Sequence, residues 1–198
     1  MIDRRTVLRA GLAATVFMMA GGHTPYRQWT VYRRKHLLIG TCRADEPTYP
    51  LGKRIAATLE QYLPESKARV SRAPDQRRLA SLITTGQLEI MLFSRDDATA
   101  LRDGAPPFED FGETQLTALF SFGDHLLVTR PDFPDRHAWL VAKTLTERAV
   151  DIDGATPAEP TALPVPIHPA AQAFAAGEPE PAAPPAIPEP DLAADHSH

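Results

Sequence analysis

Short apolar runs alternate with amphipathic stretches along the middle of this chain, and polar loops separate them. A short apolar run between turn residues is typical of a buried strand, whereas apolar residues that recur every three to four positions indicate a helix. The pattern predicts three strand-then-helix units followed by two paired strands. The predicted strands cover residues 35–41, 68–72, 88–93, 116–122 and 125–130.

The helices between these strands have recognisable ends. Pro50 suits the first turn of the first helix. Asp75 and Ser94 stand where N-cap residues belong for the next two helices, because their side chains can accept a hydrogen bond from a free backbone amide. Gly86 and Gly104 stand where those two helices should end.

A further helical pattern covers residues 135–149 and follows the strand pair almost directly. Its apolar face carries Trp139, Ala142, Leu145 and Ala149. Strands that alternate with helices predict an α/β fold, and the added strand pair makes the sheet mixed. We therefore expect a mixed sheet with helices on both faces.

The start of the chain has the composition of a targeting segment. Arg4 and Arg5 stand in the stretch DRRTVLR, which is close to a twin-arginine export motif, and the modestly apolar residues 10–22 are too short to cross a bilayer comfortably. Residues 1–22 are expected to form an export signal, with the basic start of a buried helix as the alternative. Cleavage is left open, because no clean Ala-x-Ala precedes His23.

The other end of the chain is rich in proline and acid. Residues 151–198 hold 11 of the 20 prolines, eight acidic residues and no Lys or Arg. Such a segment buries too little apolar surface to offset its ordering entropy, so we expect it to be mostly disordered or extended. Between the two ends, the 18 basic and 16 acidic residues are too evenly balanced to indicate a nucleic-acid partner.

Residue patterns that carry chemistry are scarce. Cys42 is the only cysteine, which excludes an internal disulfide and favours an unpaired loop thiol. Five of the seven histidines lack ligand spacing, whereas His196 and His198 form a terminal His-Ser-His that could hold a divalent ion weakly. No P-loop, GxSxG or HExxH motif is present. Asp96 and Asp97 fit the first turn of a helix better than an acid/base pair. We therefore expect no metal, no cofactor and no enzymatic activity.

Four segments carry a family resemblance when they are taken in order. They are IGTCRADEPTYPLGKRIAATLEQYLPE, LASLITTGQLEIMLFSRDDATALRDGAPPF, QLTALFSFGDHLLVTRPDF and ALPVPIHPAAQAF, which cover about half of the chain. In this order they resemble the TAXI family of TRAP transporter solute-binding proteins. The resemblance implies a periplasmic-binding-protein-like lobe over residues 23–150. In that family a second lobe follows the paired strands, whereas here the returning helix follows at once, so a single lobe is expected.

The resemblance also implies where a solute would bind. In the family the solute lies between two lobes and contacts the loops after the first three strands. The matching positions here are Thr41, Cys42, Tyr49, Arg72 and Ser94. Without the opposite lobe, a bound solute would stay exposed on one side, so binding is expected to be weak or to need a partner.

The loop over residues 41–49 departs from the family, because Arg43, Asp45 and Glu46 stand where the family has glycines. The inherited site is therefore expected to be degraded. The resemblance implies a periplasmic protein, tethered to the membrane if its signal is not cleaved. It would bind a small carboxylate or amino-acid-like solute, weakly or with a TRAP membrane subunit. The alternative is an adaptor whose degenerate lobe and proline-rich tail contact another periplasmic protein.

Overall fold

The computed structural model describes residues 36–152, 155–156 and 163–183, all of which belong to the compact unit that begins at His36. The export signal predicted for residues 1–22, with Arg4 and Arg5, lies outside the described residues. Within the described ranges, no helix is both long and apolar enough to span a bilayer.

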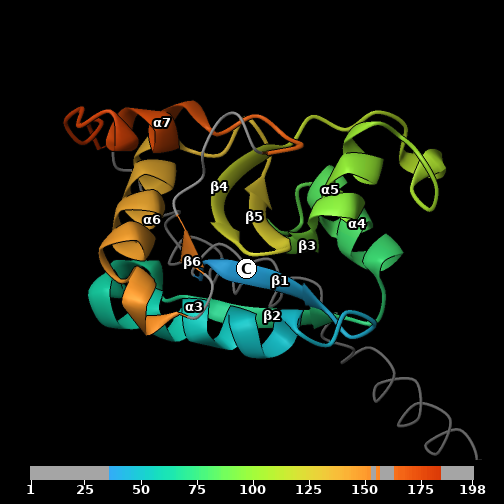
Figure 1. Cartoon of the computed structure of the whole chain (residues 1–198), viewed down its shortest axis with the longest axis horizontal. Coiled ribbons are helices and arrows are strands. Elements are labelled where there is room, and N and C mark those ends of the chain that lie inside the picture. Colours follow the sequence, from blue (N-terminus) through green and yellow to red (C-terminus); the bar gives the residue numbers. More distant parts are fainter. Residues whose placement is uncertain (1–35, 153–154, 157–162, 184–198) are drawn as a thin grey trace, which may run out of the picture. The chain divides into compact units, whose positions relative to one another are not determined.

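A six-stranded sheet forms the centre of this unit, in the order β2-β1-β3-β5-β4-β6 (Figure 1). The strands are β1 (Leu38–Cys42), β2 (Arg69–Ala73), β3 (Ile90–Ser94), β4 (Thr117–Phe122), β5 (His125–Thr129) and β6 (Ala155–Thr156). β1 pairs in parallel with β2 and β3, whereas β5 is antiparallel to both β3 and β4, and β6 is antiparallel to β4. The predicted mixed α/β sheet is confirmed.

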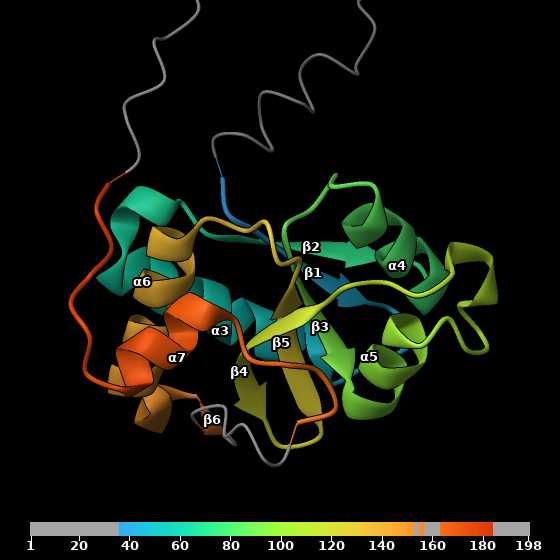
Figure 2. The same ribbon diagram turned by 90° about the horizontal axis from the view of Figure 1, so that it is seen from above.

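Helices cover both faces of the sheet, as Figure 2 shows from above. They are α3 (Thr48–Tyr62), α4 (Gln76–Thr84), α5 (Arg95–Arg102), α6 (Asp135–Glu147) and α7 (Pro169–Ala175), with short 3-10 turns at Pro64–Ser66, Glu109–Phe111 and Ala149–Asp151. The sheet separates two apolar cores: α3 and α6 pack into one, and α4 and α5 pack into the other.

The central strand β3 shows why both faces need a helix layer. Ile90 and Leu92 belong to the core beneath α3 and α6, whereas Met91 and Phe93 belong to the core beneath α4 and α5. All four side chains are buried. Successive residues of a strand point to opposite faces, so an unbroken apolar run specifies a strand that is covered on both sides.

The predicted helix caps are confirmed. The Asp75 side chain accepts a hydrogen bond from the Arg78 amide at 2.7 Å, and the Ser94 hydroxyl accepts one from the Asp97 amide at 3.1 Å. Gly86 follows α4 with a φ of 66°, in the left-handed region that favours glycine. Each of these signals depends on residues only a few positions apart, so the helix ends could be predicted from the sequence alone.

Helix α3 packs closely on β1 because of a glycine. A Cβ atom on Gly52 would lie 2.6 Å from Cγ2 of Thr41 and 3.2 Å from Cγ2 of Val70. The Thr41 side chain is held in place, since its hydroxyl donates to the Ser71 carbonyl oxygen at 2.9 Å. The contact between Gly52 and Thr41 holds α3 against the carboxyl end of β1.

We expect Gly52→Ala to lower the free energy of unfolding by about 1–3 kcal/mol through overpacking, although alanine gains about 1 kcal/mol in helix propensity. Thr41→Ser removes the methyl group that clashes and keeps the hydroxyl. In urea unfolding, the double variant should therefore recover a large part of the loss. Additive effects of the two substitutions would contradict this close contact.

Part of the C-terminal segment that we expected to be disordered is folded. Residues 163–183 lie on the lobe, with the side chains of Val165 and Ile167 buried. The Ala118 amide donates to the Pro166 carbonyl oxygen at 2.8 Å, so this segment lies beside β4. Residues 163–175 therefore depart from the prediction of a mostly disordered or extended segment, because averaging the composition over the whole tail hid a short apolar stretch. The lobe therefore extends beyond the predicted boundary at residue 150.

Candidate functional site

The order of the first three strands defines one special place on the sheet. From β1 the chain passes through α3 to β2 on one side, and from β2 it passes through α4 to β3 on the other side of β1. The loop after β1 leads to α3 and the loop after β3 leads to α5, and these two helices cover opposite faces, so the two loops diverge at the carboxyl ends of their strands. Open α/β sheets bind ligands at such a topological switch point.

We call this region the switch-point edge. It consists of the loop 43–47 after β1, Tyr49 and Lys53 in the first turns of α3, Arg72 near the end of β2, residues 94–97 at the start of α5, and His125 at the start of β5. His125 pairs with Ser94 in the sheet register. Because β5 runs antiparallel to β3, its first residue lies at the edge where β3 ends.

A hydrogen-bonding contact between two side chains joins the two sides of the switch-point edge. Nε2 of His125 lies 2.9 Å from Oδ2 of Asp45, although 80 residues separate them in sequence. Their side chains are 15% and 17% exposed, which places the pair near the surface but largely shielded from water. The pair links the loop after β1 to β5.

The loop that carries Asp45 is closed by Thr48 at the start of α3. The Cys42 amide donates to Oγ1 of Thr48 at 3.1 Å, and the Thr48 hydroxyl donates to the Asp45 carbonyl oxygen at 2.7 Å. Thr48 is fully buried. The position of Asp45 therefore depends on hydrogen bonds within the chain.

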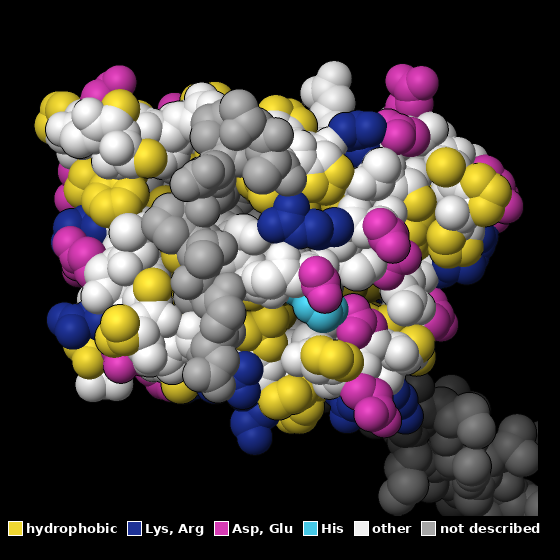
Figure 3. Space-filling view, viewed as in Figure 1, with side chains coloured by type: hydrophobic (Ala, Val, Ile, Leu, Met, Phe, Trp, Pro, Cys, Tyr) yellow, Lys and Arg dark blue, Asp and Glu magenta, His cyan; other side chains and the backbone are white. Residues whose placement is uncertain are grey.

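Acidic groups are concentrated beside the contact between His125 and Asp45. Burial raises the pKa of Asp97, the Ser94 hydroxyl opposes that shift, and the nearby carboxylates of Asp45 and Asp96 add to it. Figure 3 shows acidic side chains gathered beside a histidine on one face of the molecule. Such a surface repels a free carboxylate and favours a bound proton or a cationic group.

Arg95 is tied to the strand pair at this edge. Its Nε donates to the Gly123 carbonyl oxygen at 3.0 Å and its Nη2 to the Ser121 hydroxyl at 3.0 Å. The Arg95 amide also donates to the Asp124 carbonyl oxygen at 2.9 Å. These contacts hold α5 against the turn between β4 and β5.

The structure places two of the predicted site residues in the interior. Thr41 is fully buried and donates its hydroxyl to the Ser71 carbonyl oxygen. Cys42 is the last residue of β1, with its thiol in the core beneath α4 and α5. Neither side chain therefore offers a group to a solute at these two predicted positions, and the prediction of a loop thiol at Cys42 is wrong. The strand continues one residue further than its sequence pattern indicates.

The other three predicted residues lie nearer the surface. Ser94 uses its hydroxyl to cap α5. The guanidinium carbon of Arg72 lies 4.6 Å from the centre of the Tyr49 ring, and Nζ of Lys53 lies 5.7 Å from the same centre. Arg72 is exposed and Tyr49 is half-buried. We call Tyr49, Lys53 and Arg72 the cationic cluster, because two positive charges share one aromatic ring there.

Sequence reasoning missed the pairing of Asp45 with His125. Each residue was visible in the sequence, but nothing local connects them. Their contact depends on the insertion of β5 between β3 and β4, and the strand order determines it. A polar residue at the first position of an otherwise apolar strand was the one available signal.

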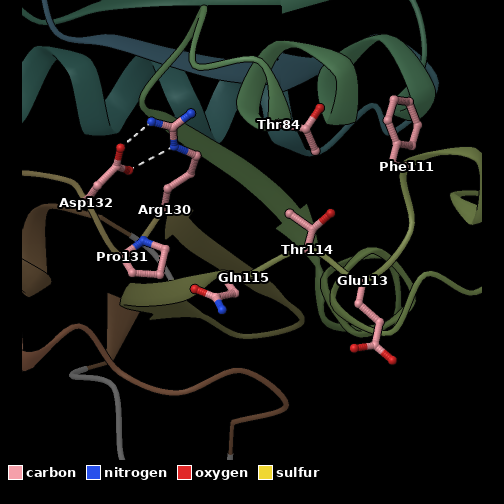
Figure 4. A pocket seen from close by; sticks show the side chains of 8 residues that line it. All are labelled: Thr84, Phe111, Glu113, Thr114, Gln115, Arg130, Pro131 and Asp132. Carbon is pink, nitrogen blue, oxygen red and sulfur yellow. Dashed lines mark hydrogen bonds and ion pairs between the residues drawn. The ribbon is translucent and has the colours of Figure 1, made fainter.

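A separate groove lies at the opposite end of the sheet, between the end of β5 and the residues before β4 (Figure 4). It has a volume of about 400 Å³ and is lined by Thr84, Phe111, Glu113, Thr114, Gln115, Arg130, Pro131 and Asp132. Arg130 and Asp132 form an ion pair in it, which lowers the pKa of Asp132 through hydrogen bonding. The groove and the switch-point edge therefore lie at opposite ends of the strands.

The chain matches no protein-family model and no curated protein. Among the residues that the structure describes, no group of three or more His, Cys, Asp or Glu side chains is arranged to hold a metal ion.

Proposed function

We propose that this chain is a periplasmic solute-binding-like protein, similar to the receptor component of TAXI-type TRAP transporters, that binds a small organic acid at its switch-point edge. The observation that carries the proposal is the strand order β2-β1-β3, with the loops after β1 and β3 leaving one edge of the sheet toward opposite faces. This is the position at which an open α/β lobe binds ligands. The resemblance of four ordered sequence segments supports the same class.

The charges at the edge favour one position for an organic acid. The carboxylates of Asp45 and Asp97 repel an anion, whereas the cationic cluster attracts one. Arg72 is exposed, and its planar guanidinium can form two parallel hydrogen bonds with a carboxylate. The solute's carboxylate therefore binds Arg72 and Lys53, beside Tyr49.

A single lobe covers only one side of such a solute, so the affinity is low. We expect succinate or glutamate to bind with a dissociation constant near the millimolar range, about −4 kcal/mol. A partner such as a TRAP membrane subunit, or a second protein that covers the edge, would raise the affinity. It would exclude water from the ion pair between the solute's carboxylate and Arg72.

Arg72→Ala is expected to weaken this binding by at least about tenfold, because a charged hydrogen bond contributes about 1.5–3 kcal/mol. Arg78→Ala is the matched control, since Arg78 is also exposed but lies outside the cationic cluster. Isothermal titration calorimetry with succinate compares the three proteins. Equal weakening by both variants would show a general effect of charge instead of a site.

The second candidate function is an adaptor that binds another periplasmic protein. It is favoured by the exposure of Arg43 and Glu46, which make the loop after β1 a charged, solvated surface. Thr41 and Cys42 are buried beside this loop and offer no side chain to a small solute. An adaptor would bind no carboxylate at millimolar concentration, which distinguishes it from the solute-binding protein.

A further inference from the structure

A histidine is buried where the C-terminal segment crosses from the sheet to α6. His168 is fully buried, and its backbone amide donates to the Ala118 carbonyl oxygen of β4 at 2.9 Å. Directly after it, Pro169 begins α7. His168 therefore stands at the point where the segment 163–183 leaves β4 and turns onto α6.

Both ring nitrogens of His168 have backbone partners. Nδ1 lies 3.3 Å from the Ala170 amide, which can only donate, and Nε2 lies 3.1 Å from the Phe133 carbonyl oxygen, which can only accept. The ring must accordingly be neutral, with its proton on Nε2. An imidazolium carries N–H groups at both positions, so its Nδ1 proton would oppose the Ala170 N–H and remove the cap of α7.

The segment beyond His168 packs on α6 through apolar side chains, one indole hydrogen bond and one ion pair. The rings of Trp139 and Phe174 meet edge to face at 5.3 Å, and the Trp139 indole donates to the Glu178 carbonyl oxygen at 3.3 Å. An exposed ion pair joins Arg136 to Glu180 at 2.7 Å. Trp139 therefore contacts the segment directly through both its ring and its N–H group.

We propose that His168 is a pH-sensitive latch: it holds the segment 169–183 against α6 while its ring is neutral, and it releases the segment when the ring is protonated. Residues 163–167, with the buried side chains of Val165 and Ile167, stay on β4, and release exposes the surface of α6 around Trp139. This device does not depend on solute binding at the switch-point edge.

The surroundings of His168 determine whether docking of the segment strengthens or weakens as the pH falls. Burial lowers its pKa, while the Phe133 carbonyl oxygen and the Asp135 carboxylate oppose that shift to a smaller extent. His137 also packs against Phe133, and Glu180 forms the surface ion pair with Arg136. Because the docked ring has a lower pKa than the released ring, release takes up a proton. Docking is therefore complete above about pH 6.5 and weakens as the pH falls below that value, by up to about tenfold per pH unit.

The test follows Trp139 fluorescence in the full chain carrying Trp29→Phe, which leaves Trp139 as its only tryptophan. Between pH 8 and pH 5, we expect a reversible shift of the emission to longer wavelength with a midpoint below 6.5. Hydrogen exchange over the same range should show the protection factor of the Ala170 amide falling, while the amides of β1 and β3 stay protected. Unchanged emission in this range would overturn the proposal, as would simultaneous loss of protection in β3.

Two substitutions separate His168 from its titratable neighbours. His168→Asn keeps an oxygen that can accept from Ala170 but does not titrate, so it should abolish the transition above pH 5. His137→Asn removes an exposed histidine next to Phe133 and should leave the midpoint in place. If His137→Asn removed the transition, or if His168→Asn retained it, the latch would be refuted. Should His168→Asn fail to fold, the pKa of His168 measured by NMR in the Trp29→Phe protein decides: a value above 6.5 contradicts the proposal.

Discussion

Truncation after Ala162 is expected to destabilise the lobe severely, whereas truncation after Ala183 should leave its stability nearly unchanged. The shorter chain loses the buried side chains of Val165 and Ile167 and uncovers the edge of β4 and the Trp139 side of α6. Burial of one such aliphatic side chain contributes about 1.5–3 kcal/mol. We therefore expect a loss of at least about 3 kcal/mol, a large part of the roughly 5–15 kcal/mol available to a typical domain.

Urea denaturation of the full chain and the two truncated chains measures this difference. The chain that ends at Ala183 is the matched control, because it keeps every described residue of the C-terminal segment and removes only residues 184–198. Equal midpoints for all three chains would mean that residues 163–183 contribute nothing to the lobe. Such a result would restore the original prediction of a disordered tail.

Substitution of both Arg4 and Arg5 by lysine is expected to leave the precursor in the cytoplasm. The proposed periplasmic location depends on these two residues, which stand in the stretch that resembles a twin-arginine signal. Lysine keeps the positive charge but not the planar guanidinium, so recognition of the arginine pair should fail although the net charge is unchanged. Cell fractionation followed by immunoblotting gives the distribution of the protein.

Arg9→Lys provides the matched control for export, because it makes the same exchange in the same segment outside the arginine pair. The control protein should reach the periplasm normally. If the doubly substituted protein were still found there, or if its export required the general secretion machinery, the twin-arginine proposal would be wrong.

Local signals in the sequence predicted the elements of the fold well. Strand β3 could be predicted because a short apolar run bounded by turn residues is typical of a strand that is covered on both faces. The caps at Asp75 and Ser94 depend on a side chain and an amide three residues away, so they too are local. Helix α3 begins at Thr48 and not at Pro50, a difference of the size expected for helix ends.

Features that depend on tertiary contacts could not be predicted in the same way. The contact of Asp45 with His125 depends on which strands are neighbours, and the burial of Thr41 and Cys42 depends on how closely α3 and α4 approach β1. Tyr49 and Arg72 were named separately from the family resemblance, and the structure brings them together. The docking of residues 163–183 likewise requires a partner surface on β4 and α6.

The most direct test of the binding proposal is an NMR titration of the isotopically labelled protein with succinate up to millimolar concentration. We expect chemical-shift changes to concentrate at Tyr49, Lys53 and Arg72, with smaller changes in the loop that contains Asp45. Shifts confined to the groove around Arg130 would place the ligand at the other end of the sheet. Such shifts, or the absence of any change at millimolar succinate, would contradict a binding site at the switch-point edge.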